Sequence, residues 1–170
     1  QNRIEMMMND DTLTEQQMME LAKIEQTISE LIRLNKTLLF LSKIENNQYI
    51  EQTDVDINSK IRRQMEMLAE VYESKNITTH LYDKGQWTLT ANDELMASLV
   101  SNLLRNAYIH SLPHSTIDIY IKEGALSIAN TGANDTLDTS RLFDRFYCGN
   151  PGKQHSNGLG LSIVKAICEV

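Results

Sequence analysis

The sequence contains little cysteine and no long hydrophobic run, and both absences exclude classes of protein. Its two cysteines, Cys148 and Cys168, form no Cys-x-x-Cys pair and the histidines do not cluster, so neither a zinc site nor a disulfide framework is indicated. No apolar stretch approaches the roughly 20 residues that cross a bilayer, and the first residues lack a signal-peptide pattern. We therefore expect a soluble chain in a reducing, cytoplasmic setting, with membrane contact only through segments upstream of it.

Positive charge is also scarce. Lys and Arg number 16 against 23 Asp and Glu, which gives the 170 residues a formal net charge of −7 at pH 7. A surface that holds nucleic-acid phosphates needs an excess of basic residues, so nucleic acid is not an expected partner. Any phosphate that the chain binds must be held locally.

Glycine and proline are absent from residues 1–84, which predicts a largely helical first part. Thr14 and Gln17 form a capping box, at which a helix should begin. Apolar residues then recur at steps of three and four, as in the seam of a helical bundle: Leu21, Ile24, Ile28, Leu31 and Leu38. A short apolar piece at residues 3–8 is typical of the end of a preceding helix.

These features predict a helical hairpin that ends at about Ile44. One hairpin buries little surface by itself, so two copies are expected to form a homodimer through a four-helix bundle, with Asn35 in the seam fixing the register. The alternative is that the apolar stripe packs on another part of the same chain.

The rest of the chain alternates between strand and helix patterns. Strands are predicted at 54–57, 76–82, 86–90, 115–122 and 125–130, and helices at a segment capped by Asn58, from Asp93 to His110 and from about Leu161. The strands at 76–82 and 86–90 are expected to pair around Gly85. The pattern predicts an α+β protein: a two-layer α/β sandwich, in which helices cover one face of a mixed sheet, preceded by the helical hairpin. The strands are too few to look like a finished sheet.

Two local patterns carry chemistry. Asn102, Asn106 and His110 recur every four residues and share one polar stripe of the helix at 93–110. An amide oxygen suits Mg²⁺, although a solvated helix face is the alternative. Gly158 and Gly160 stand one residue apart before the last helix, where they form either a plain turn or a backbone cradle for phosphate.

Four motifs together resemble those of sensor histidine kinases. NLLRNA is similar to the N box of that family, IANTG to its adenine-binding box, LFDRFY to its F box and GLGLSIVK to its second glycine box, in the family's order. ISELIRLNKTLLFLSKIE is similar to the second helix of the family's dimerisation and phosphotransfer domain. The resemblance implies a partial dimerisation hairpin at residues 1–50 and a Bergerat-fold ATP-binding catalytic domain at 51–170 that lacks its final strands.

The resemblance also implies roles for individual residues. Asn106 would coordinate Mg²⁺, Asn102 would support the nucleotide or a metal-bound water, and both would count as catalytic. Asn130 would meet the adenine amino group, and a lid over residues 143–157 would close Phe146 over the nucleotide. The whole nucleotide-binding set comprises Asn102, Asn106, His110, Asn130, Gly132, Phe146, Gly158, Leu159, Gly160 and Leu161.

The resemblance implies a kinase that transfers the γ-phosphoryl group of ATP to a histidine, for relay to the receiver domain of a response regulator. None of His80, His110, His114 and His155 is followed by an acidic residue, so the acceptor is expected outside this chain and the chain alone is expected not to phosphorylate itself. We take the chain as the soluble portion of a membrane-anchored sensor. The alternatives are a Bergerat-fold ATPase or Ser/Thr kinase, and a non-catalytic nucleotide-sensing dimerisation module.

Three departures from the family pattern bear on the phosphate site. Asn130 stands where the family usually has Asp, Ile109 where Lys is frequent and Cys148 where Arg is frequent. Fewer cations then face the phosphates, with Arg145, Lys153 and His110 as the candidates, so a modest nucleotide affinity is expected. Asn102 cannot abstract a proton from water, which disfavours hydrolysis relative to transfer.

Overall fold

The computed structural model describes residues 13–122, 124–133, 138–148 and 157–170. Its contacts divide the chain into two compact units, Gln1–Ser42 and Lys43–Val170. Within the described ranges, no helix combines the length and the apolar character needed to cross a bilayer.

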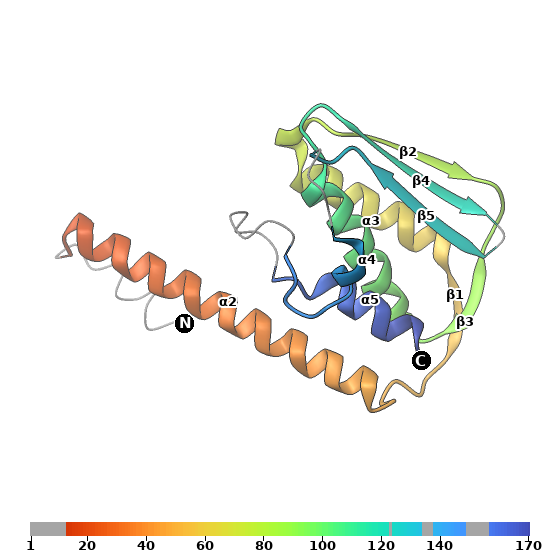
Figure 1. Ribbon diagram of the computed structural model, residues 1–170, viewed down its shortest axis with the longest axis horizontal. Coiled ribbons are helices and arrows are strands. Elements are labelled where there is room, and N and C mark those ends of the chain that lie inside the picture. Colours follow the sequence, from red (N-terminus) through yellow and green to blue (C-terminus); the bar gives the residue numbers. More distant parts are fainter. Residues whose placement is uncertain (1–12, 123, 134–137, 149–156) are drawn as a thin grey trace. The chain divides into compact units, whose positions relative to one another are not determined.

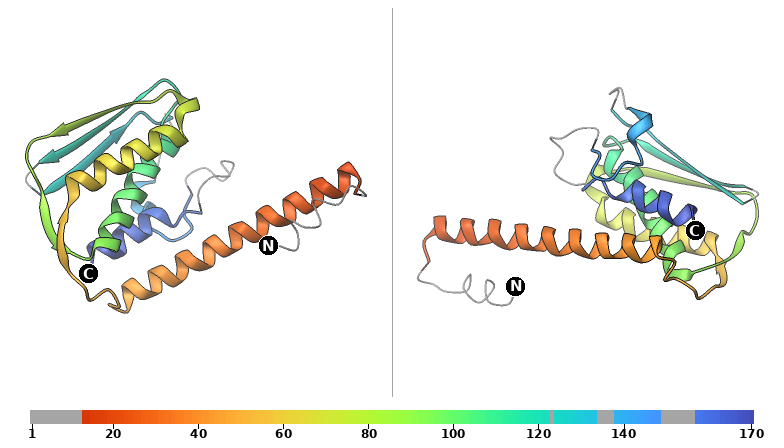
Figure 2. Two further views of the ribbon diagram at one scale, coloured as in Figure 1. Left: turned by 180° about the vertical axis from the view of Figure 1, so that it is seen from behind. Right: turned by 60° about the horizontal axis from the view of Figure 1, so that its bottom comes forward.

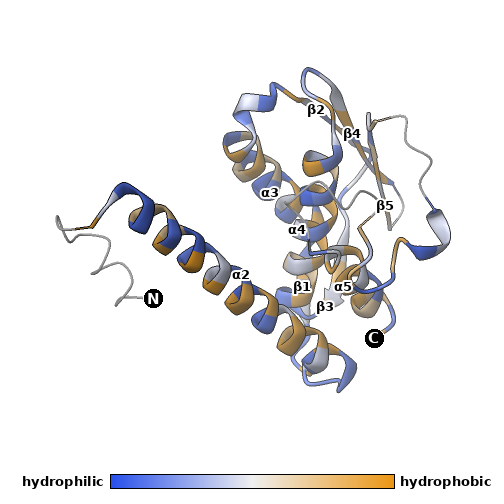
Figure 3. Ribbon diagram, turned by 60° about the vertical axis from the view of Figure 1, so that its left-hand side comes forward, coloured by the Kyte–Doolittle hydropathy of each residue, from blue (hydrophilic) through white to orange (hydrophobic). Residues whose placement is uncertain are grey.

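The first unit consists, in its described part, of most of the long helix α2 (Glu15–Glu45). The helix begins at the predicted capping box: the Thr14 N–H donates to Gln17 Oε1 at 2.9 Å, and the Gln17 N–H donates to Thr14 Oγ1 at 3.3 Å. Hydrophobic residues recur along α2 (Figure 3), and several are exposed, among them Ile24 at 49 % and Leu31 at 59 %. The first arm of the predicted hairpin falls on residues 1–12, outside the described residues.

The second unit contains two sheets (Figure 1). Strand β4 (Thr116–Lys122) lies between β2 (Thr78–Asp83) and β5 (Ala125–Asn130). It pairs with β2 in parallel and with β5 antiparallel, so this sheet is mixed as predicted. Strand β1 (Thr53–Asp56) pairs antiparallel with β3 (Thr88–Ala91) in a separate ladder.

The helices α3 (Ile57–Val71), α4 (Asp93–His110) and α5 (Gly160–Cys168) complete the second unit, together with the short 3-10 turns η1 (Glu73–Lys75) and η2 (Thr139–Arg141). The views from opposite sides (Figures 1 and 2) show α3 and α4 on the same face of the three-stranded sheet. This arrangement confirms the predicted two-layer α/β sandwich.

The core lies between that face of the sheet and the helices. Alternate residues of β4 are buried, which is the period expected of a strand with one covered face. The core residues are at most 6 % exposed and come chiefly from β4, α3 and α4: Ile117, Ile119, Ile121, Ile61, Leu68, Val100, Leu104 and Tyr108. One face of α4 is therefore fixed against the sheet, which sets the direction of its other faces.

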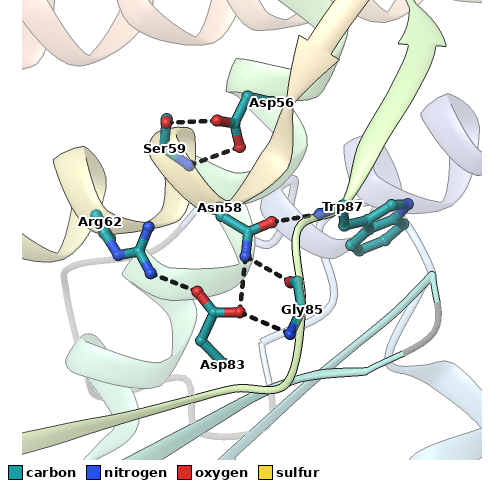
Figure 4. Close-up of polar contacts among 7 residues, drawn as sticks. All are labelled: Asp56, Asn58, Ser59, Arg62, Asp83, Gly85 and Trp87. Carbon is teal, nitrogen blue, oxygen red and sulfur yellow. Dashed lines mark hydrogen bonds and ion pairs between the residues drawn. The ribbon is translucent and has the colours of Figure 1, made fainter.

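The predicted pairing of β2 with β3 is wrong, because a buried side chain replaces the expected hairpin. Asn58 is 3 % exposed, and its Nδ2 donates to Asp83 Oδ1 at 2.9 Å and to the Gly85 carbonyl at 3.0 Å (Figure 4). Its Oδ1 accepts from the Trp87 N–H at 2.9 Å. With its backbone bonded to this amide, the connection between β2 and β3 leads the chain from one sheet to the other.

Asn58 is also not the cap of α3. The cap is Asp56, whose carboxylate accepts from the Ser59 N–H at 3.1 Å and from Ser59 Oγ at 2.8 Å (Figure 4). Each of these hydrogen bonds favours the ionised carboxylate, which lowers the pKa of Asp56.

Replacing Asn58 with alanine should destabilise the second unit by about 2 kcal/mol, because the buried amide is lost and Asp83, Gly85 and Trp87 each lose a hydrogen-bond partner. The substitution should also change the dependence on pH. The Asn58 amide is the main cause that lowers the pKa of Asp83, followed by smaller contributions from Gly85 and Arg62. A lowered pKa in the folded state stabilises the fold above the carboxyl's unfolded pKa of about 4, and this stabilisation is lost as the pH falls through the folded pKa.

Urea unfolding at neutral pH and below about pH 4 measures both effects. The Asn58→Ala chain should lose less stability on acidification than the parent. As a control, Asp83→Asn keeps the bonds of Asn58 to Gly85 and Trp87, so it should flatten the acid limb with a smaller loss at neutral pH. Equal acid sensitivity of Asn58→Ala and the parent would contradict the assignment.

Candidate functional site

The site is organised along α4. The helix begins at Asn92, whose side chain accepts from the Leu95 N–H at 3.1 Å, and two acidic residues occupy its first turn, where the helix dipole favours them. One face of α4 packs in the core. Asn102 and Asn106 lie on a stripe beside that face, about one turn apart, and both are half-buried.

Asn102 is oriented by its own helix. Its Nδ2 donates to the Ser98 carbonyl at 2.9 Å and lies 3.3 Å from Ser98 Oγ, one turn earlier. The amide oxygen is thereby directed at the start of α5, because a Cβ built on Gly160 would lie 3.2 Å from Asn102 Oδ1. Ser98 was not singled out in the sequence, although its spacing of four residues from Asn102 was a readable signal.

Asn106 lies one turn further along the stripe. Its side chain has no hydrogen-bond partner among the described residues, so its amide is available to a ligand. The described residues also hold no group of three or more His, Cys, Asp and Glu side chains that could bind a metal. A hard cation here would have to take the Asn106 oxygen and complete its shell with ligand oxygens and water, which is a mode suited to Mg²⁺.

Gly160 is the first residue of α5 and Gly158 lies two residues before it, where the backbone is tightly packed. Gly158 has a φ of +62°, and a Cβ on it would lie 2.6 Å from the Phe146 carbonyl carbon and 2.7 Å from Tyr147 N and O. The Phe146 N–H donates to the Gly158 carbonyl at 2.9 Å. The residue predicted to cover the ligand and the glycine pair are therefore joined through their backbones, twelve positions apart in the sequence.

The N-cap residue of α5 is Leu159, whose side chain makes no capping hydrogen bond to the first N–H groups of the helix. Such N–H groups and the helix dipole attract anions. Leu159 is only 3 % exposed and Leu161 is half-buried, so both residues pack at the start of α5.

Phe146 has a φ of +63° and is 56 % exposed, so its ring is available to cover a ligand. The segment before it has local contacts of its own: Asp138 caps η2, and hydrogen bonds from Ser140 lower the pKa of Asp138. The Arg141 guanidinium lies 4.8 Å from the centre of the Tyr147 ring. Residues 149–156 of the predicted lid lie outside the described residues.

The exposed Asn130 ends β5, and the residues after it lie against the other end of α4. A Cβ on Gly132 would lie 3.7 Å from the His110 carbonyl oxygen, and the Leu112 N–H donates to the Thr131 carbonyl at 3.0 Å. From Asn102 to His110, α4 advances about 12 Å. The structure thus places the glycine pair and the 130–132 segment at two separate points along one helix.

The predicted cations have different surroundings. Arg145 forms an ion pair with Glu45, and both side chains are about half exposed. His110 is exposed in the last turn of α4, and Lys153 lies outside the described residues. Arg145 is therefore already neutralised by a carboxylate, which weakens its case as a phosphate-binding group.

Residues 91–170 match the model of the histidine kinase-, DNA gyrase B-, and HSP90-like ATPase family. The chain is 29 % identical over 163 residues to the sensor protein CzcS of Cupriavidus metallidurans, with 88 % of this chain and 33 % of the relative covered. It is 32 % identical over 156 residues to the heme sensor protein HssS of Staphylococcus haemolyticus, with 85 % and 33 % covered. The chain thus spans about a third of the length of these curated relatives.

The fold is similar to that of ShkA, solved at full length in complex with AMPPNP. The TM-score is 0.71 at 20 % sequence identity, and the similarity covers 93 % of this chain and 35 % of the other. At this identity the likeness concerns the fold alone, and it agrees with the two-layer architecture described above.

Proposed function

We propose that this chain, which is of the sensor histidine kinase type and matches the ATPase family model over residues 91–170, binds ATP and directs its γ-phosphoryl group to a histidine outside this chain. The observation that carries the proposal is the alignment of three features along α4. The Asn102 oxygen faces Gly160, the Asn106 amide lies one turn on, and Gly132 lies against His110. An elongated ligand with an anionic end at the glycine pair suits such a site.

In this proposal the triphosphate lies at Gly158 and Gly160, where the first N–H groups of α5 meet its oxygens. The adenine lies at the other end, where Asn130 accepts from the adenine amino group and Gly132 lets the base approach the backbone. Phe146 covers the nucleotide from the connected segment, and His110 borders it. The bound AMPPNP of ShkA supports a nucleotide as the ligand.

The residues present fit Mg²⁺, since Asn106 offers a neutral oxygen ligand beside the proposed phosphate position. When bound, the ion would neutralise charge on the phosphate oxygens. With the ion bound, the Asn102 oxygen would support the nucleotide or a water of the ion's shell, while Ser98 keeps the Asn102 NH₂ group turned away. Because an amide cannot take a proton from water, this side chain does not promote hydrolysis, and transfer to an acceptor is the favoured outcome.

We further propose that residues 1–50 belong to a dimerisation and phosphotransfer hairpin and that residues 51–170 form the catalytic domain. The exposed apolar residues of α2 support self-association into a homodimer, since such a stripe is stable when it is buried in a helical bundle. The partner that receives the phosphoryl group from the histidine would be the receiver domain of a response regulator. Because the proposed substrate is ATP, the chain would act in the cytoplasm.

Incubation with γ-labelled ATP and Mg²⁺ tests the proposed function. The chain should bind nucleotide by calorimetry, should incorporate no acid-labile phosphate by itself, and should label a separate helical bundle that carries a histidine followed by an acidic residue. Sustained release of inorganic phosphate without acceptor would favour the ATPase alternative, and binding without transfer to any acceptor would favour the nucleotide-sensing module. Acid-labile phosphate on His80 or His110 of the chain alone would overturn the external acceptor.

A further inference from the structure

A lysine that the sequence did not single out binds the C-terminal end of α4. Lys75 ends η1, and its Nζ donates to the carbonyl oxygens of Tyr108 and Ile109, both at 2.8 Å, and of Ser111 at 3.1 Å. The last carbonyls of a helix lack partners within the helix, and a cation there is favoured by the helix dipole. The ammonium of Lys75 therefore fixes the backbone at and just beyond the last turn of α4.

The position of Lys75 is itself determined by packing. Its Nζ lies 5.6 Å from the centre of the Tyr72 ring, and that ring stacks on Tyr108 with centroids 5.6 Å apart. The Lys75 carbonyl accepts from the His114 N–H at 2.8 Å. Side chain and backbone of Lys75 thus hold the chain on both sides of Ser111.

The same stretch of backbone supports the adenine end of the proposed site. The His110 carbonyl lies against Gly132, and the Leu112 N–H donates to the Thr131 carbonyl. His110 and Leu112 flank Ser111, whose carbonyl accepts a hydrogen bond from Lys75. A shift of this helix end would displace the 130–132 segment, whereas the glycine pair packs near Asn102, about 12 Å away along α4.

We propose that Lys75 is a positioning residue for the adenine end of the nucleotide site. It acts by holding the end of α4 against which the 130–132 segment is placed. This inference rests on the proposed nucleotide binding. It predicts a loss of affinity that depends on which part of the nucleotide the probe contains.

The test compares Lys75→Met with the same substitution at Lys60, a lysine that binds the opposite end of α4. Lys60, whose side chain is 20 % exposed, binds Asp93 in the first turn of α4 at 2.8 Å. Lys75→Met should weaken ADP binding about tenfold and leave the affinity for inorganic triphosphate with Mg²⁺ unchanged. Lys60→Met should change neither affinity, and urea unfolding of both variants reports any general loss of stability.

A conservative variant covers the case in which Lys75→Met fails to fold. Lys75→Arg keeps the charge, but its planar guanidinium cannot reproduce the three contacts of a compact ammonium, so it should show a smaller loss for ADP and none for triphosphate. Parental ADP affinity in both Lys75 variants, or equal losses for ADP and triphosphate, would overturn the positioning role. Failure of the parent chain to bind either probe would instead contradict the proposed function.

Discussion

Replacing Gly158 with alanine is expected to abolish nucleotide binding and to destabilise the second unit by about 3 kcal/mol or more. The new Cβ would lie 2.6 Å from the Phe146 carbonyl carbon and 2.7 Å from two backbone atoms of Tyr147. Backbone atoms cannot rotate away as a side chain can, and the φ of +62° adds strain for any residue with a Cβ. Relief of the contact requires Phe146 or the start of α5 to move, and both belong to the proposed site.

Gly124→Ala is the matched control, because it separates the effect of the backbone angle from that of the contact. Gly124 also has a left-handed φ, of +78°, but the nearest atom that a Cβ there would meet among the described residues is Trp87 Nε1, at 3.8 Å. This variant should lose about 1 kcal/mol of stability and keep its nucleotide affinity. Thermal unfolding and calorimetry with a non-hydrolysable ATP analogue measure the two effects. Equal behaviour of the two alanine variants would show that crowding at Phe146 and Tyr147 is irrelevant.

Asn106→Ala is expected to weaken Mg²⁺-dependent binding of the same analogue by about 10- to 100-fold, as for the loss of one hydrogen bond or ligand to a charged group. The fold should be unaffected, because the Asn106 amide has no hydrogen-bond partner among the described residues and alanine is the best helix former. Binding measured without Mg²⁺ should change much less, since the lost group is a ligand of the ion.

Asn35→Ala provides the control for an asparagine removed from a helix, because Asn35 lies in α2, outside the proposed nucleotide site. Its nucleotide affinity should equal that of the parent. Should Asn106→Ala keep both the affinity and the Mg²⁺ dependence of the parent, the metal would have to be bound elsewhere and the role of the stripe on α4 would be refuted.

The sequence by itself determined the elements whose signals are local. The helix α4 runs from Asp93 to His110 as predicted, the capping box at Thr14 and Gln17 forms, and β4 and β5 pair antiparallel as the expected hairpin. A capping box joins residues three apart, a helical stripe residues four apart, and a hairpin neighbouring strands. Such patterns can be read directly along the chain. The family motifs were legible for the same reason, because each is a short run of consecutive residues.

Only the tertiary structure decided the contacts between distant segments. It paired β2 with β4 rather than β3, since buried Asn58 binds the connection after β2. It also revealed that a Cβ on Gly158 would meet the backbone of Phe146 and that Lys75 binds the end of α4. A side chain's type shows which hydrogen bonds it can make, but its partner depends on which backbone groups the fold brings within about 3 Å. For the side chains of Asn58 and Lys75 and the Cβ position of Gly158, those groups lie from 11 to 36 positions away in the sequence, and packing alone brings them together.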